Sequence, residues 1–252
     1  MERLAIMGGT FDPIHMGHLR MAHAVQRQMD FDRVVFLPSY IPPHKQTRSN
    51  CASWQDRLAM VELAIQNYDN FVVSSLEFDR GGISYTYDTV NFMQELWPDA
   101  EIYLIIGEDS LTQLYTWYRI QDLLRLVRFV AAERPGYDGE VGVARLTKAY
   151  GPWVAGKIIH AEVPETAISS TEIRQRLRDG KPALPDEAGR GGAEPRRSLR
   201  RVGGDAPEDG GHPEGPGDRA RPEHPCDPPT GRVRRLRENR RPRRGRPGNG
   251  PL

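Results

Sequence analysis

The stretch LAIMGGTFDPIHMGH, residues 4–18, decides the fold class of this chain. Its first four residues form a short apolar run that is typical of a buried strand, and Gly8-Gly9 ends that run in a turn. After His18, apolar residues recur at helical spacing up to Met29, which predicts a helix. A buried strand, a glycine turn and a helix in this order are the beginning of an α/β domain.

The same alternation continues along the chain. We predict strands at 33–37, 71–73, 76–78, 101–106, 127–132 and 157–160, and helices at 54–67 (with Ser53 as N-cap), 86–97 and 120–126. A final helix is capped by Ser170 or Thr171 and runs to about Arg178. This pattern predicts a parallel sheet with helices on both faces, in which ligands bind at the C-terminal ends of the strands. The stretches 8–10, 38–45 and 107–109 each follow a strand, so we expect them on one edge.

The composition of residues 187–252 differs from that of residues 1–186. The later stretch contains 13 Gly, 11 Pro and 16 Arg in 66 positions and no Phe, Trp or Tyr, so it cannot form a core. We therefore expect one folded domain, residues 1–186, and a disordered low-complexity tail. An Arg-rich tail is typical of electrostatic nucleic-acid binding. Our preferred explanation is a shifted reading frame, because Gly, Pro, Arg and Ala have GC-rich codons.

Several classes of protein are disfavoured by the composition. Cys51 and Cys226 are the only cysteines and form neither a disulfide framework nor a metal-ligand spacing, which indicates reduced thiols in the cytosol. Met1 is followed almost at once by the first strand, which leaves no room for a signal peptide. No apolar run approaches the ~20 residues of a membrane helix. We expect a soluble, cytoplasmic protein without a membrane partner; a homo-oligomer stays open.

His15 and His18 are the candidate catalytic residues. The preceding glycines allow a phosphate to approach the backbone closely, and two histidines at a helix start can converge on an anion with free N–H groups. Imidazole donors there would stabilise the charge that develops during attack on an α-phosphate. Incidental surface histidines are the plain alternative, which the complete spacing disfavours. A zinc site is a second alternative, but Asp12 is the only nearby third ligand and no cysteine is close.

A second motif, ISSTEIR, occupies residues 168–174. Ser-Ser-Thr at a helix start offers hydroxyl and backbone N–H groups to a phosphate, and Arg174 adds positive charge. Taken alone, the motif is explained better by an ordinary Ser/Thr helix cap with a capping-box residue. Together with the histidine motif, it favours phosphate binding.

GGTFDPIHMGH with ISSTEIR resembles the nucleotidylyltransferase superfamily, whose HxGH and ISSTxxR motifs jointly bind ATP. The segments PPHK, SYTYDT, IGED, TWY and ERPG, at 42–45, 84–89, 106–109, 116–118 and 133–136, look like those of the nicotinate-nucleotide adenylyltransferase family. The resemblance covers residues 3 to about 180. It implies a Rossmann-like fold and an enzyme of NAD biosynthesis that joins the AMP part of ATP to nicotinate mononucleotide, giving nicotinate adenine dinucleotide and pyrophosphate.

The resemblance also implies a role for individual residues. His15 and His18 would be catalytic, whereas ATP would be bound by Gly8, Gly9, Thr10, Phe11, Gly107, Asp109, Ile168, Ser169, Ser170 and Arg174, and the second substrate by His44, Lys45, Thr86, Trp117 and Arg134. A flat indole suits a pyridine ring. Backbone N–H groups at a helix start favour a carboxylate over an amide. Core packing for Trp117 and a solvated charge for Lys45 are the alternatives.

Rival functions stay open at this point. One rival is a sister transferase that acts on phosphopantetheine or nicotinamide mononucleotide, and another is a nucleic-acid-binding protein that acts through the tail. Mg²⁺ is expected to arrive with ATP, because no carboxylate cluster is evident. Two features depart from the family pattern. Ala167 stands where an acidic residue is usual, and residues 180–185 lead into the low-complexity tail instead of a closing segment that contains Tyr and Val.

Overall fold

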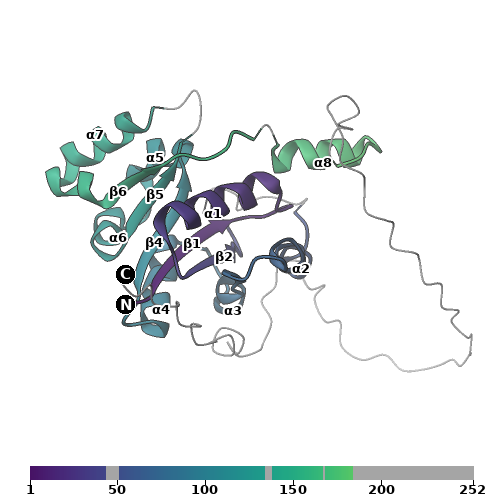
Figure 1. Cartoon of the computed structure of the whole chain (residues 1–252), viewed down its shortest axis with the longest axis horizontal. Coiled ribbons are helices and arrows are strands. Elements are labelled where there is room, and N and C mark those ends of the chain that lie inside the picture. The colour runs from purple at the N-terminus through teal and green to yellow at the C-terminus, as the bar shows by residue number, and fades with distance from the viewer. Residues whose placement is uncertain (44–50, 134–137, 167, 184–252) are drawn as a thin grey trace, which may run out of the picture.

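A six-stranded sheet lies at the centre of the computed structural model, which describes residues 1–43, 51–133, 138–166 and 168–183 (Figure 1). The strands are β1 (Arg3–Gly9), β2 (Arg33–Pro38), β3 (Phe71–Val73), β4 (Glu101–Gly107), β5 (Arg128–Ala132) and β6 (Ile158–Ala161). Their order is β3-β2-β1-β4-β5-β6, and every pairing is parallel. The predicted parallel α/β sheet is therefore confirmed.

Helices connect the strands and cover both faces of the sheet (Figure 1). They are α1 (Met16–Met29), α2 (Trp54–Ile65), α3 (Leu76–Arg80), α4 (Thr86–Leu96), α5 (Glu108–Gln113), α6 (Ile120–Leu126), α7 (Gly139–Tyr150) and α8 (Ser170–Arg178), with the 3₁₀ turns η1 (Leu114–Thr116) and η2 (Pro152–Lys157). Within the described residues, none of these helices has the length and apolar character needed to cross a membrane.

Alternate residues of β1 supply two separate cores. Ala5 and Met7 pack in the cluster that contains the buried residues of α1 and α2, whereas Ile6 packs in the cluster that contains those of α4, α5 and α6. Successive side chains of a strand point to opposite faces, so a strand that is buried on both faces is apolar throughout. This is why the short continuous apolar runs predict the strands correctly.

The glycine turns lie at the same edge of the sheet. Gly8 and Gly9 pair with the last residues of β2, and Gly107 pairs with Ala132 at the end of β5. Strand β1 lies between β2 and β4, so the chain order runs in opposite directions on its two sides. Ligands of open α/β sheets bind at such a switch point, outside the carboxyl ends of the strands. The predicted shared edge is confirmed for the described parts of these loops.

The prediction of a strand at 76–78 is wrong, because Leu76–Arg80 form the short helix α3. The Asp79 amide donates to the Ser75 carbonyl at 3.0 Å, and the Ser75 hydroxyl donates to the Asp79 carboxylate at 2.8 Å. These local bonds close one helical turn. A run of three residues is shorter than a turn, so its apolar-polar alternation does not distinguish a strand from a helix.

Helices α5 and α7 are missing from the sequence prediction. In α7, a Cβ atom at Gly139 would lie 2.6 Å from Glu108 Oε1, and one at Gly142 would lie 2.6 Å from the Leu111 carbonyl oxygen. Glycine is thus required where α7 packs on α5, and it weakens the helical pattern of the sequence. The last helix begins one residue earlier than predicted, with Ser169 as its N-cap. The other predicted elements agree with the structure to within a few residues at their ends.

Candidate active site

His15 and His18 lie together at the start of α1. His15 is the N-cap residue, and the His18 amide donates to the His15 carbonyl at 2.9 Å. The two imidazole ring centroids are 3.8 Å apart. The first turn of α1 contains no acidic residue, so the partial positive charge of the helix start is not offset there. The predicted convergence of the two rings at a helix N-terminus is therefore seen in the structure.

The proton position on His18 follows from its contact with the backbone. The His15 amide donates a hydrogen bond to His18 Nδ1 at 3.2 Å. A ring nitrogen that accepts a hydrogen bond carries no proton, so a neutral His18 carries its proton on Nε2. The ring also packs edge-on against Phe11, with centroids 5.2 Å apart. His18 is thus oriented by two contacts and has a donor on Nε2.

A pocket opens beside His15. Its walls come from the start of α1, the end of β5 and the segment between β6 and α8: His15, Gly17, Met21, Glu133, Val163, Pro164, Glu165, Thr166 and Ile168. Gly17 allows the His15 ring and Thr166 to lie close to the backbone of α1, because a Cβ at this position would lie 3.0 Å from the His15 ring and 3.3 Å from Thr166. Ile168, one of the predicted ATP-binding residues, lines this pocket together with His15.

Helix α8 contacts the turn between β1 and α1, although the two are far apart in sequence. The Ser170 hydroxyl donates to the Pro13 carbonyl at 2.9 Å. Arg174 donates to the Asp12 carbonyl through its NH1 and to the Thr171 hydroxyl through its NH2, the latter at 3.2 Å. The tertiary structure thus brings the second predicted motif against the first. Ser169 acts as the helix cap, with its hydroxyl accepting from the Glu172 amide at 3.1 Å.

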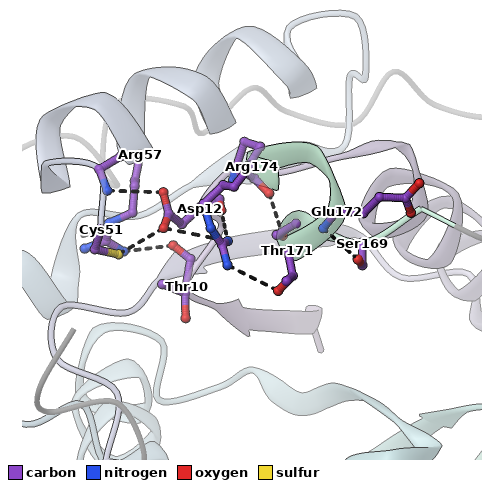
Figure 2. A network of polar contacts seen from close by, with 11 residues as sticks. Thr10, Asp12, Cys51, Arg57, Ser169, Thr171, Glu172 and Arg174 are labelled. Atoms are coloured by element: carbon purple, nitrogen blue, oxygen red, sulfur yellow. Dashed lines mark hydrogen bonds and ion pairs between the residues drawn. The ribbon is translucent and has the colours of Figure 1, made fainter. Parts of the chain in front are cut away.

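Asp12 joins three segments of the chain (Figure 2). Its buried carboxylate accepts from the Ala52 amide and from the Cys51 thiol, each at 3.2 Å, and lies 3.8 Å from Arg174 NH1. Sequence reasoning considered Asp12 only as a third zinc ligand. In the described part of the chain, no group of three or more His, Cys, Asp and Glu side chains is placed to hold a metal ion. The structure instead gives Asp12 the role of a junction between the first motif, α8 and the segment before α2.

Arg57 is a buried side chain that forms hydrogen bonds to the backbone of the glycine turn. Its side chain is 2% exposed, and NH1 donates to the Thr10 carbonyl at 2.8 Å and the Ser39 carbonyl at 2.7 Å. The Phe11 ring is also buried, with 2% exposure, so a ligand would meet only the backbone of this residue. Sequence reasoning missed Arg57, because one arginine on an otherwise ordinary helix gives no signal of a buried role.

Gly107 and Asp109 lie at the end of β4, beside the glycine turn of β1. Gly107 is the N-cap of α5, and Asp109 is half-buried in the first turn of that helix. Both residues lie at the carboxyl edge of the sheet, as the sequence predicts, and the strand order places them next to the switch point between β1 and β4.

Thr86 and Trp117 lie in the layer of the domain that contains α4 and α6. Thr86 is the first residue of α4, and the side chain of the N-cap residue Tyr85 makes no capping hydrogen bond. Trp117 is half-buried, packs against the core of the α4 and α6 layer and lies edge-on to Phe129. Tyr118 links the two segments, because its ring centroid lies 4.6 Å from that of Tyr85, the N-cap residue of α4. Sequence reasoning quoted Tyr118 within TWY and gave it no role.

His44, Lys45 and Arg134 lie outside the described residues, and so does Ala167. The described chain ends at Pro43 before the first gap and at Glu133 before the second. Glu133 belongs to the pocket beside His15.

Comparisons with known proteins show the family to which this chain belongs. The cytidylyltransferase-like family model matches residues 6–176. The probable nicotinate-nucleotide adenylyltransferase of Desulfitobacterium hafniense (strain DSM 10664 / DCB-2) is 41% identical over 181 residues, which are 72% of this chain and 86% of that protein. The nicotinate-nucleotide adenylyltransferase of Bacillus subtilis (strain 168) is 38% identical over 190 residues, 74% of this chain and 93% of that protein. The chain belongs to the nicotinate-nucleotide adenylyltransferase family.

A solved structure shares the nicotinate-nucleotide adenylyltransferase fold seen here. The Plasmodium falciparum nicotinic acid mononucleotide adenylyltransferase, complexed with NaAD, superposes with a TM-score of 0.58 at 21% identity and covers 70% of this chain and 84% of that one. At this identity the likeness shows the fold alone. The family-model match lies within residues 1–186, so the adenylyltransferase motifs all belong to the part of the chain before the Arg-rich tail.

Proposed function

We propose that this chain transfers the adenylyl group of ATP to nicotinate mononucleotide and releases pyrophosphate. The observation that carries the proposal is the pair of adjacent imidazoles, His15 and His18, at the start of α1, with the ISSTEIR helix bonded to the turn that precedes it. An ATP molecule bound there would meet two imidazoles, free backbone N–H groups and an arginine, all of which favour a polyphosphate. The relatives that act on nicotinate nucleotides identify the second substrate.

The pocket beside His15 suits the adenosine part of ATP. Val163, Pro164 and Ile168 provide apolar walls for a flat base, whereas the Glu133 and Glu165 carboxylates accept hydrogen bonds. The triphosphate would extend from this pocket along the start of α1 toward Arg174. Gly8, Gly9, Thr10, Ser169 and Ser170 would approach the phosphates, with Gly107 and Asp109 near the ribose.

The chemical step is a direct displacement. A 5′-phosphate oxygen of nicotinate mononucleotide attacks the α-phosphorus of ATP, a new oxygen–phosphorus bond forms, and the bond to the bridging oxygen breaks to release pyrophosphate. The Nε2 donor of His18 stabilises the charge on the phosphate oxygens. No Ser, Cys or Lys stands in GGTFDPIHMGH as a nucleophile, so positioning and charge stabilisation account for catalysis.

Mg²⁺ would arrive as part of the substrate, MgATP. Mg²⁺ prefers oxygen ligands and is commonly held by the phosphates of the substrate with one or two carboxylates. Asp12 is the acidic residue of the first motif. Its carboxylate accepts hydrogen bonds from Ala52 and Cys51 and lies near Arg174, so it is poorly placed to bind Mg²⁺. The metal would neutralise the developing charge on the pyrophosphate.

The test of this proposal uses ATP with a chiral sulfur-labelled α-phosphate. The full chain should form nicotinate adenine dinucleotide and pyrophosphate in equal amounts, with inversion of configuration at phosphorus, because one displacement inverts it. Retention would mean two displacements and a covalent enzyme intermediate. Formation of no dinucleotide would reject the assigned reaction itself.

Truncation after Asp186 tests the rival that assigns the function to the tail. Residues 187–252 lie outside the described residues, and we propose that they take no part in adenylyl transfer. The truncated chain should keep kcat and both KM values within about twofold of the full chain. Any binding of the full chain to RNA or DNA should weaken as salt rises, because it rests on charge. A large loss of activity on truncation would contradict this proposal. We also propose that the chain acts in the cytoplasm, and a cellular location elsewhere would contradict that separate proposal.

A further inference from the structure

Glu77 is a buried acid whose role the proposed reaction does not explain. It lies on α3, and its side chain is 4% exposed. The Thr89 hydroxyl donates to its Oε1 at 2.7 Å, the Ser84 hydroxyl and the Tyr40 backbone lie near the carboxyl group, and Oε2 accepts no hydrogen bond within the described residues. Burial raises the pKa of Glu77, while these neighbours and the nearby Arg80 charge oppose the rise. A buried acid of this kind costs stability unless all its bonds are made.

The partners of Glu77 stand on both sides of the start of α4. Ser84 lies two residues before Thr86, the first residue of the helix, and Thr89 lies three residues after it. Residues three apart are neighbours on one face of a helix. The carboxyl group therefore holds the first turn of α4 through Thr89 and lies beside Ser84 in the segment that enters α4.

The same network ties the start of α4 to the end of β2. The Tyr40 amide donates to the Ser84 hydroxyl at 2.9 Å, and the Ser84 amide donates to the Ile41 carbonyl at 2.9 Å. Ile41 also forms a parallel bridge with Ile83. The segment before α4 is thus attached to the loop that follows β2, and Glu77 lies at the centre of these bonds.

The start of α4 is also where the second substrate would place its charge. Its N-cap residue, Tyr85, makes no side-chain cap bond, and the first N–H groups of a helix have no partner within the helix itself. A carboxylate satisfies such groups well, whereas an amide does so poorly. Small displacements of these groups would change that difference, because hydrogen bonds weaken steeply with distance and angle.

We propose that Glu77 is a positioning residue that sets where the first turn of α4 lies, and that it thereby determines the preference for nicotinate over nicotinamide mononucleotide. The inference rests on the proposed function. Glu77 acts through Ser84 and Thr89 and touches no substrate itself. Packing alone does not require an acid here, since a leucine of similar size would fill the same space without the cost of burying a polar group.

The experiment compares three variants of the full chain: Glu77→Leu, Glu77→Gln and Thr89→Val. Glu77→Leu should raise KM for nicotinate mononucleotide about tenfold and lower the nicotinate-to-nicotinamide ratio of kcat/KM about tenfold, with KM for ATP within twofold of its original value. Glu77→Gln keeps a carbonyl oxygen that accepts from the Thr89 hydroxyl and should keep most of the preference. Thr89→Val keeps the shape of threonine without its hydroxyl and should lower the ratio two- to fivefold.

Asp79→Ala is the matched control. Asp79 is a second acid of α3, two residues from Glu77, and its carboxylate accepts from the Ser75 hydroxyl outside this network. This variant should keep the original ratio. If the Leu and Val variants both keep the ratio, or if every KM including that for ATP rises equally, Glu77 has a general structural role and the inference is wrong. An unsubstituted chain that forms no dinucleotide would instead reject the proposed function, and the inference with it.

Discussion

His18→Ala should lower kcat by about 10²–10³, with a much smaller change in KM for either substrate. Removal of one preorganised donor from a site of developing charge typically has this effect. The structure gives the reason for expecting the full effect at His18. Its Nδ1 accepts from the His15 amide, so the remaining ring nitrogen, Nε2, is the donor, and the ring is held by contact with Phe11. A donor already oriented in the free protein requires no reorganisation during the reaction.

Two further variants make this prediction specific. His18→Gln places an amide N–H near the position of Nε2 and should recover part of kcat. His23 is an exposed histidine on the same helix, 5.9 Å from the Tyr68 ring, and His23→Ala should leave kcat unchanged. The free energy of unfolding of His18→Ala, measured by thermal unfolding, should be lower by only about 1 kcal/mol, because one capping contact of α1 is removed. Near-normal turnover of this variant would exclude His18 from the mechanism.

Nicotinate mononucleotide should exceed its amide in kcat/KM by tens to several hundredfold. The free N–H groups at the start of α4 favour a charged carboxylate, and ion–dipole contact with hydrogen bonds to a charged group contributes about 2–4 kcal/mol. At about 1.4 kcal/mol for each factor of ten, this gives the stated range. The measurement is kcat/KM for both pyridine nucleotides at saturating MgATP.

The amide substrate should differ mainly in KM, since its phosphate would meet the same His15 and His18. KM for ATP, measured with either pyridine nucleotide, should be the same within about twofold. Equal kcat/KM for the two pyridine nucleotides would contradict the nicotinate assignment and leave the adenylyl-transfer chemistry untouched. Raised salt is a useful second probe, because the charge contact at a helix start weakens as ions screen it.

Local patterns were enough for most of the fold. Short apolar runs such as Leu4–Met7 and the run at 101–106 predict strands because both faces of the sheet are buried. Failures occurred where local signals conflict or vanish. Residues 76–78 are too few to show a period, and Gly142 weakens the helical pattern of α7 because that helix must approach the Leu111 carbonyl closely.

The sequence by itself determined the family, the parallel α/β fold and the two motifs proposed to bind phosphate, because these depend on residue type and spacing along one segment. Only the tertiary structure decided which residues meet across the chain. The contacts of Asp12 with Cys51, Ala52 and Arg174, and that of Glu77 with Thr89, join separate segments of the chain. A buried acid has no sequence pattern of its own, since its hydrogen-bond partners are chosen by packing and not by spacing.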